Sequence, residues 1–329
     1  MNLHEDTNLF ADVIAKASSS PLYGGLGLRQ LFIEKDYWIT KSLKHLSESQ
    51  LSMMVVFKGG TSLSKAFNIG RRFSEDIDIA VIRSNGGSDA KLKNVIRSIE
   101  KTMATDLYPI NHPLSSKGSR YRKTFYSYPT ILTNALGGKV VLTGQILFEI
   151  NSFANPFPYQ EIEIRSFVYD YLKKIERSDI IEDFNLHPFK LNVLDKRTTM
   201  TEKLVSLMRF SLSRDFLTEL EAKIRHFYDL HFLLMDAECH RYLFSQECKN
   251  IFIELIEHDR NLFDKPEGWR EKSLSASPLL TNFQETWERL RKRYKDELPF
   301  LTFSSDIPDA KDIEKSLVEI MDFVKRTGI

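Results

Sequence analysis

Two carboxylates separated by one residue form the most informative chemical feature of the sequence. Asp76 and Asp78 open a segment whose β-branched residues and alternation predict a strand. Residues two apart on a strand point to the same face, so both carboxylates project together while Ile77 and Ile79 point into the core. Two like charges held this close are costly unless a cation neutralises them. Hard oxygen ligands of this kind suit Mg²⁺, whose coordination is completed by waters and substrate phosphates.

A glycine pair precedes these carboxylates in the motif Lys58-Gly59-Gly60-Thr61-Ser62. The apolar run Met53–Phe57 before it predicts a buried strand beside the Asp76 strand, and a short helix is expected over Leu63–Phe67. A turn without side chains lets phosphate oxygens approach the backbone amides at the start of the helix, and Thr61 or Ser62 could add a hydroxyl donor. Each half alone is usually a plain surface strand or turn. The combination is much more specific.

The elements around these motifs predict a mixed α and β first half. Apolar residues at spacings of three and four predict helices, and alternating or continuous apolar runs predict strands. The expected helices are Asp6–Ala17, Leu31–Leu46 and Ser88–Asp106, and the further expected strands are Tyr121–Tyr128 and Lys139–Asn151.

From Thr198 onward the pattern becomes helical. Thr199 and Glu202 have the spacing of a capping box. Further helices are expected over Asp215–Met235 and Ala310–Arg326, each with apolar residues on one face.

Composition excludes several broad classes of protein. The 46 Lys and Arg nearly balance the 45 Asp and Glu, so a net charge of +1 provides no global attraction to nucleic acid. Cys239 and Cys248 are too few for a disulfide scaffold and lack metal-ligand spacing, which fits a reducing cytoplasm. We expect both to be packing residues. No segment approaches about 18 uncharged apolar residues, so no membrane association is expected.

Together, these motifs resemble the AbiEii/AbiGii toxin family of the DNA polymerase β-type nucleotidyltransferase superfamily. The resemblance covers about residues 30 to 235, through Glu34-Lys35-Asp36-Tyr37, Lys58 to Leu63, Arg72 to Asp78, Thr201-Glu202-Lys203-Leu204 and Arg225 to Leu230. It implies an α/β nucleotidyltransferase domain over residues 1–195, with N-terminal helices and a small mixed sheet. Residues 196–329 would form a mainly helical domain that closes the active-site cleft.

The resemblance implies transfer of a nucleoside monophosphate from a nucleoside triphosphate, with release of pyrophosphate. Asp76 and Asp78 would hold Mg²⁺ against the triphosphate, where metal ions offset charge developing on the entering and leaving oxygens. The residues expected to contact the nucleotide are Lys58, Gly59, Gly60, Thr61, Ser62, Arg72, Ser74 and Lys203.

Glu149 is the candidate for a third carboxylate, which a second Mg²⁺ would need. It is a lone acid in the apolar strand segment Leu147-Phe148-Glu149-Ile150, where a charge is expensive without a partner. It could serve as a metal ligand or base. The alternative is that it pairs with an Arg or Lys at the strand end.

Three helical residues complete the predicted site. The resemblance implies that Lys203 neutralises triphosphate charge, although a single Lys is by default a solvated residue. Asp229 would be an active-site acid that orients Lys203 or the nucleotide. The alternative is an intrahelical ion pair between Asp229 and Arg225, four residues apart. His226 could contact a phosphate or base, but a single helical His more often fills a structural niche.

Basic and aromatic residues suggest where an acceptor nucleic acid could bind. Guanidinium groups bind phosphates and aromatic rings stack on bases, although such runs are usually solvated loops. The candidates are Arg71, Arg72, Arg120, Arg122 and Lys123, interleaved with Tyr121 and Phe125. The sequence leaves open whether Lys35 and Asp36 contact ligand or brace the turn.

Three functions remain open. The resemblance implies the toxin of a type IV-like toxin–antitoxin or abortive-infection system, which modifies an RNA such as tRNA and has a cognate antitoxin. The same chemistry could instead act on a protein or small-molecule hydroxyl, because acceptor choice lies in loops and surface shape. The fold could also serve as a nucleotide-binding module without turnover.

Overall fold

A computed structural model describes residues 1–70, 72–83, 89–132, 144–302 and 307–328. The chain divides into two compact units. Unit 1 comprises Met1–Ala66 and Phe73–Leu194, and unit 2 comprises Phe67–Arg72 and Asp195–Ile329. No helix in the described part of the chain is long and apolar enough to cross a membrane.

Unit 1 is built on a mixed sheet of eight strands in the order β3-β5-β6-β2-β1-β8-β7, with β4 paired to β5. The sheet confirms the predicted α/β class. Strands β1 and β2 are antiparallel neighbours, and β2 runs parallel to β6. The bounds are β1 Val55–Lys58, β2 Asp76–Val81, β3 Tyr108–Ile110, β4 Ser116–Lys117, β5 Tyr121–Ser127, β6 Gln145–Asn151, β7 Tyr159–Ile164 and β8 Phe189–Leu194.

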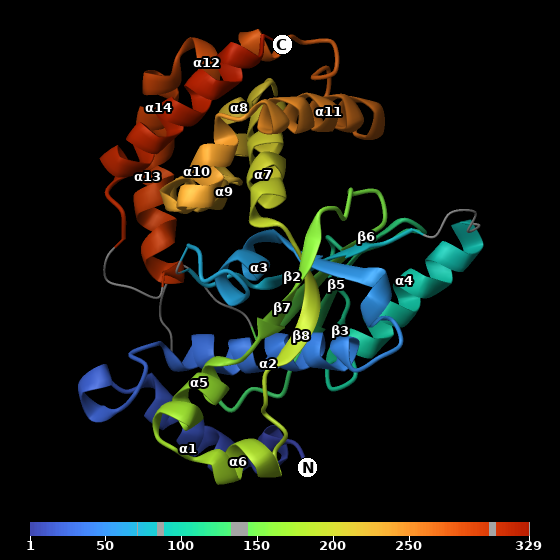
Figure 1. Ribbon diagram of the computed structural model, residues 1–329, viewed down its shortest axis with the longest axis vertical. Helices are drawn as coiled ribbons and strands as arrows, with labels where there is room; N and C mark the ends of the chain where they lie inside the picture. The colour runs from blue at the N-terminus through green and yellow to red at the C-terminus, as the bar shows by residue number, and fades with distance from the viewer. Residues whose placement is uncertain (71, 84–88, 133–143, 303–306, 329) are drawn as a thin grey trace. The chain divides into compact units, whose positions relative to one another are not determined.

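The α-helices of unit 1 are α1 Thr7–Ser18, α2 Gln30–Ser47, α3 Gly59–Lys65, α4 Asp89–Met103, α5 Phe167–Lys174 and α6 Ser178–Asp183. Helix α2 packs against α4, α1 and α5. Figure 1 shows α2 lying between the sheet and the group formed by α1, α5 and α6.

One face of the sheet forms the core of unit 1. Ile77 on β2 and its neighbour Phe148 on β6 are both fully buried. Helix α4 covers this face, because its Glu100 is bonded to Arg122 and Tyr126, which share a face of β5. The predicted inward orientation of Ile77 and Ile79 is confirmed, since neither has any exposed surface.

From Lys196 onward, the described residues of unit 2 form helices joined by loops. The helices are α7 Lys196–Ser211, α8 Phe216–Glu221, α9 Ile224–Met235, α10 Ala237–Leu243, α11 Gln246–Leu262, α12 Pro278–Thr281, α13 Phe283–Leu301 and α14 Ala310–Thr327, with a 3-10 turn at Leu274–Ala276. Helix α9 packs against α7, α10, α13 and α14, and the last two run side by side in red in Figure 1. Cys239 and Cys248 are buried and free, as expected for packing residues.

Several predicted element bounds were wrong. Helix α3 begins directly at Gly59, so the glycine pair opens the helix and no separate turn precedes it. Helix α7 is capped by Asp195, whose side chain accepts from the Arg197 amide, and not by Thr199. The single helix expected over 215–235 is interrupted between α8 and α9. The first residues of the predicted strand Lys139–Asn151 lie outside the described residues, and β6 begins at Gln145.

Candidate active site

Asp78 of β2 lies in a row of charged residues that crosses four strands. In the pairing register, Asp78 is opposite Lys58 on β1 and opposite Glu149 on β6, and Glu149 is opposite Lys123 on β5. Directly paired residues of neighbouring strands point to the same face of a sheet. Asp76 points to that face as well, since it is two residues from Asp78. The row therefore reads Lys, Asp, Glu, Lys on the face opposite Ile77.

Gly59 is required by the position of Asp78. Its φ is +80°, in the left-handed region, and a Cβ at this position would lie 2.0 Å from Asp78 Oδ2. Any side chain would therefore be strained and would displace the carboxylate. The carboxylate of Asp78 rests against the start of α3, where the sequence placed a phosphate-binding element.

Thr61 and Ser62 are buried, and their hydroxyl groups donate to main-chain carbonyls. Thr61 Oγ1 donates to the carbonyl of Asp76, and Ser62 Oγ donates to the carbonyl of Gly59 at 2.9 Å. The first bond joins α3 to the start of β2. These residues therefore position the carboxylate strand, and a direct bond to phosphate stays a prediction. Ser74 is also buried, at 8% exposure.

Glu149 forms an ion pair with Lys123, with 2.7 Å between Oε1 and Nζ. In this structure Glu149 therefore pairs with a lysine, which was the alternative to its predicted role as a metal ligand or base. Tyr121 lies on the same strand face as Lys123, and its pKa is raised by burial and by the negative charges of Glu149, Asp78 and Asp76. From the sequence, Tyr121 was expected only to stack on bases, but it lies on the same sheet face as the charged row.

The residues present fit a hard divalent cation in donor type, because Asp76 and Asp78 supply carboxylate oxygens from one face of β2. Within the described ranges, no group of three or more His, Cys, Asp or Glu side chains could hold a metal ion. The three-carboxylate site expected from Asp76, Asp78 and Glu149 is therefore not assembled here, since Lys123 holds the third carboxylate.

Helix α2 braces the residue before the carboxylate strand and the end of α3. Lys35, only 1% exposed, binds Glu75 Oε1 at 2.5 Å, one residue before Asp76. Asp36 Oδ1 binds Lys65 Nζ at 2.5 Å at the end of α3, and its Oδ2 accepts from the amide of Phe167. Lys35 and Asp36 therefore act as braces. Glu75 and Lys65 were not identified from the sequence as partners of Lys35 and Asp36. The signal was present, because charged residues on the apolar face of a helix need partners of opposite charge.

The predicted helical acid and lysine meet within unit 2. Asp229 is 2% exposed and accepts a bidentate pair of bonds from Arg72, at 2.6 Å from Nε and 2.7 Å from Nη2. Lys203 Nζ lies 2.8 Å from Asp229 Oδ2. Despite burial, which acts in the opposite direction, the charges of Arg72 and Lys203 hold the pKa of Asp229 well below its ordinary value. Asp229 is thus ionised and holds both cations in place.

The alternative pairing of Arg225 with Asp229 was wrong. Arg225 Nε instead bonds Glu297 Oε1 at 3.0 Å, because Asp229 has two better-placed cations from other segments. Burial, followed by the charge of Lys203, lowers the pKa of His226 well below its ordinary value, and its Nδ1 has no hydrogen-bond partner among the described residues. His226 is therefore a neutral ring packed beside the cluster.

The predicted acceptor patch is only partly available. Arg122 is 8% exposed and paired with Glu100, so its place in the patch was wrong: its strand position faces α4. Phe125 stacks on His112 at a ring distance of 3.8 Å. Arg120 is exposed, and Arg71 lies outside the described residues.

The mixed sheet, with two same-face aspartates beside a glycine-initiated helix, is that of a nucleotidyltransferase, as the family match shows. The chain belongs to the family described as nucleotidyl transferase AbiEii toxin of type IV toxin–antitoxin systems, which it matches over residues 41–313. The match extends beyond residue 235, where the similarity seen in the motifs ended, and begins after the Glu34 to Tyr37 element.

The solved structures that are similar to this chain include two described as nucleotidyltransferases. MenT4, the nucleotidyltransferase toxin Rv2826c from Mycobacterium tuberculosis H37Rv, has 15% identity and a TM-score of 0.49, with 96% of this chain and 89% of that chain covered. A putative nucleotidyltransferase from H. pylori has 14% identity and a TM-score of 0.40, with 90% and 95% covered. No curated protein matches the sequence.

Proposed function

We propose that this toxin transfers a nucleoside monophosphate from a nucleoside triphosphate to an RNA in the cytoplasm, with the tRNA acceptor end as the favoured target. The observation that carries the proposal is the placement of Asp76 and Asp78 on one face of β2, with Asp78 resting against Gly59. Growth arrest would follow from loss of functional RNA, and a cognate antitoxin would counteract it.

Asp76 and Asp78 would hold Mg²⁺, which when bound neutralises charge on the triphosphate and on the pyrophosphate that leaves. The missing side chain at Gly59 lets the carboxylate of Asp78 lie against the backbone at the start of α3. Glu149 would join as a third ligand, or accept the proton of the attacking hydroxyl, once its carboxylate leaves Lys123. Lys203 and Asp229 remain candidate catalytic residues on the strength of the family motif.

The experiment supplies each α-³²P-labelled nucleoside triphosphate in turn, with Mg²⁺ and total cellular RNA, and resolves the products with and without RNase. The variants are Asp76→Asn and Asp78→Asn, which keep side-chain shape and remove charge. Glu163→Gln, an exposed acid on β7 with 57% of its side chain accessible, is the matched control. We expect RNase-sensitive, tRNA-sized label with wild type and the control, and at least a ~10³-fold loss in both Asn variants.

The other outcomes separate the alternatives. Label that resists RNase and migrates with protein would keep the chemistry and replace the acceptor. Equal labelling of RNA by the Asn variants would contradict the proposed site. Tight Mg²⁺-dependent triphosphate binding without any labelled product would favour a binding module.

A further inference from the structure

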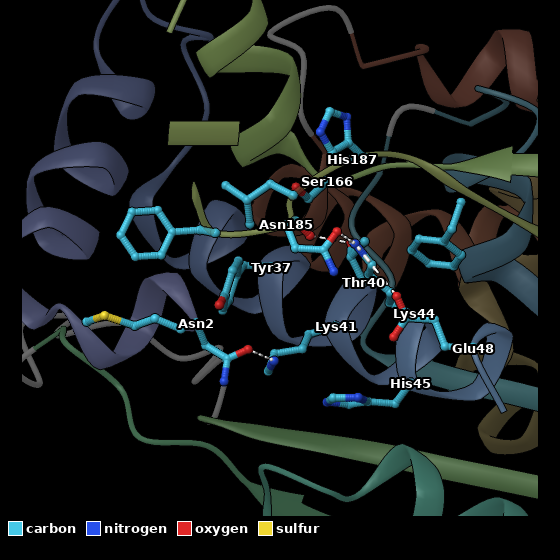
Figure 2. A pocket seen from close by; sticks show the side chains of 14 residues that line it. Asn2, Tyr37, Thr40, Lys41, Lys44, His45, Glu48, Ser166, Asn185 and His187 are labelled. Carbon is cyan, nitrogen blue, oxygen red and sulfur yellow. Dashed lines mark hydrogen bonds and ion pairs between the residues drawn. The ribbon is translucent and has the colours of Figure 1, made fainter. Parts of the chain in front are cut away.

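Unit 1 contains a pocket whose lining residues are separate from the candidate active site. The cavity of about 230 Å³ lies between α2 and the segment that joins α6 to β8. None of its lining residues belongs to β1, α3, β2 or β6. Figure 2 shows Tyr37, Lys41, Lys44 and His45 of α2 facing this space, with Asn185 opposite.

Lys44 is held at the wall of the pocket by neutral oxygens. Its Nζ donates to both the carbonyl oxygen of Asn185, at 2.5 Å, and Asn185 Oδ1, at 3.0 Å. Asn185 has a left-handed backbone conformation, with φ +50°, which Asn tolerates better than most residues. In this conformation its carbonyl oxygen and its Oδ1 both accept from Lys44. A lysine carries three N–H donors, so Asn185 takes two of them.

The charge of Lys44 is poorly compensated. The carboxylate that pairs with it is that of Glu48, 3.9 Å away with 54% of its side chain exposed. By contrast, Asp106 binds both Lys41, at 3.0 Å, and His45, at 2.7 Å. Burial and the charge of Lys41 lower the pKa of Lys44, while Glu48 acts in the opposite direction. An anionic oxygen in the pocket would take the remaining donor and supply the missing negative charge.

Part of the remaining wall is apolar and would suit the body of a small ligand, beside polar lining residues such as Asn2 and Thr40. Phe184, Leu186 and Phe189 line it and are half-buried. The volume is slightly below the range of roughly 300 to 1,000 Å³ that is typical of sites for larger metabolites. The pocket therefore fits one ring with one charged group.

We propose that this pocket binds a small anion that carries one phosphate or carboxylate on a ring-sized apolar body. Lys44, positioned by Asn185, binds the anionic group, and the aromatic wall contacts the ring. The site is independent of the nucleotidyl-transfer chemistry, so its test does not depend on the acceptor.

The probes are phenyl phosphate and benzoate, which distinguish the two anionic groups, together with uncharged benzyl alcohol. Binding to the full chain is measured by titration calorimetry and by ligand-observed NMR. For a ligand of this size we expect a dissociation constant on the order of 1 mM for at least one anion. Benzyl alcohol is expected to bind at least about tenfold more weakly.

Lys44→Met keeps the apolar stem and removes the charge, and Lys44→Arg keeps the charge. Lys190→Met is the matched control, since Lys190 lies on β8 next to Phe189 but does not line the pocket. We expect anion affinity to fall at least about tenfold in Lys44→Met, to be largely retained in Lys44→Arg and to be unchanged in the control. Circular dichroism checks that each variant is folded.

Three results would overturn the proposal. The first is an absence of saturable anion binding to the wild type. The second is equal binding of benzyl alcohol, and the third is undiminished anion affinity in folded Lys44→Met. None of these results bears on nucleotidyl transfer, which is measured separately at Asp76 and Asp78.

Discussion

Asp78 lies between a lysine and a glutamate in the register of the sheet. Lys58 lies beside it on β1, while the charge of Glu149 on its other side is offset by Lys123. Without Lys123, the carboxylates of Asp78 and Glu149 would be adjacent like charges. A cation that recruits Glu149 must therefore compete with the Lys123 ammonium.

This competition predicts how Lys123→Met responds to Mg²⁺. Without Mg²⁺ the variant should lose up to about 1 kcal/mol of unfolding free energy, because the pair is partly exposed. Addition of Mg²⁺ should raise the Tm of Lys123→Met more than that of the wild type, since Glu149 is then available. Thermal melts with and without Mg²⁺ measure both effects.

Lys190→Met is the matched control for this prediction, because it removes another lysine that pairs with a glutamate on the neighbouring strand, Glu161 at 3.2 Å. Its Tm should respond to Mg²⁺ as the wild type does. If Lys123→Met and wild type gain the same Tm with Mg²⁺, Glu149 and the cation are not coupled.

Helix α3 is a short element fixed at both ends. At its start, Gly59 accommodates Asp78 and Thr61 donates to the Asp76 carbonyl. At its end, Lys65 binds the buried Asp36 of α2. These contacts at both ends fix the position of Gly59 relative to Asp76 and Asp78. A helix this short would not hold that position without them.

Gly59→Ala should therefore do more than strain the backbone. Gly24→Ala is the matched control, since Gly24 has φ +86° and a Cβ at this position would have no atom within 4 Å among the described residues. Both substitutions incur the left-handed strain of about 1 kcal/mol. Only Gly59→Ala meets Asp78 Oδ2, so only it should also abolish nucleotidyl transfer.

The measurements are urea unfolding and the labelled-RNA assay on both glycine variants. Retention of transfer by a folded Gly59→Ala protein would show that Asp78 can move without loss of function. Loss of transfer in Gly24→Ala would show that backbone strain far from Asp78 is enough to abolish activity. The contact with Asp78 would then not be the cause of the loss in Gly59→Ala.

The whole chain does not divide in simple sequence order. Residues Phe67–Arg72 belong to unit 2, although the segments on both sides of them belong to unit 1. Arg72 is bonded to Asp229, which lies 157 residues away. This ion pair fixes the segment Phe67–Arg72 to the helices of unit 2. Because the pair is buried, removal of one partner should strongly lower the free energy of unfolding.

The free energy of unfolding of unit 2 should fall at acidic pH because Asp229 becomes protonated. Its pKa is lowered in the folded state, so its stabilising contribution is complete above the ordinary carboxyl pKa of about 3.9 and is lost as the pH falls towards the lowered value. Asp229→Asn should destabilise by about 3 to 5 kcal/mol at pH 7. That difference from wild type should shrink below about pH 4.

Urea unfolding from pH 3 to 7 tests this, in a Trp38→Phe background where fluorescence reports Trp269 and Trp287 of unit 2. Asp322→Asn, which removes an exposed helical acid paired with Lys325, is the control and should change little. A difference between Asp229→Asn and wild type that stays constant down to pH 3 would contradict the assigned charge state.

The local sequence pattern was sufficient to predict the strands and helices that carry the candidate site residues. The same-face placement of Asp76 and Asp78, with Ile77 buried between them, follows from the two-residue period of a strand and needs no tertiary information. Long amphipathic helices such as α2 and α14 were predicted to within about one residue. The break between α8 and α9 was not, because Ala222 and Lys223 are good helix formers.

By itself, the sequence determined the chemical types: two aspartates on one strand face, a glycine before them and a family of nucleotidyltransferase toxins. Only the tertiary structure decided the partners. Strand register placed Glu149 beside Asp78 and Lys123 beside Glu149, and packing in unit 2 brought Arg72 to Asp229. The physical reason is that periodicity is local, whereas register and ion pairing join segments that the chain order does not relate.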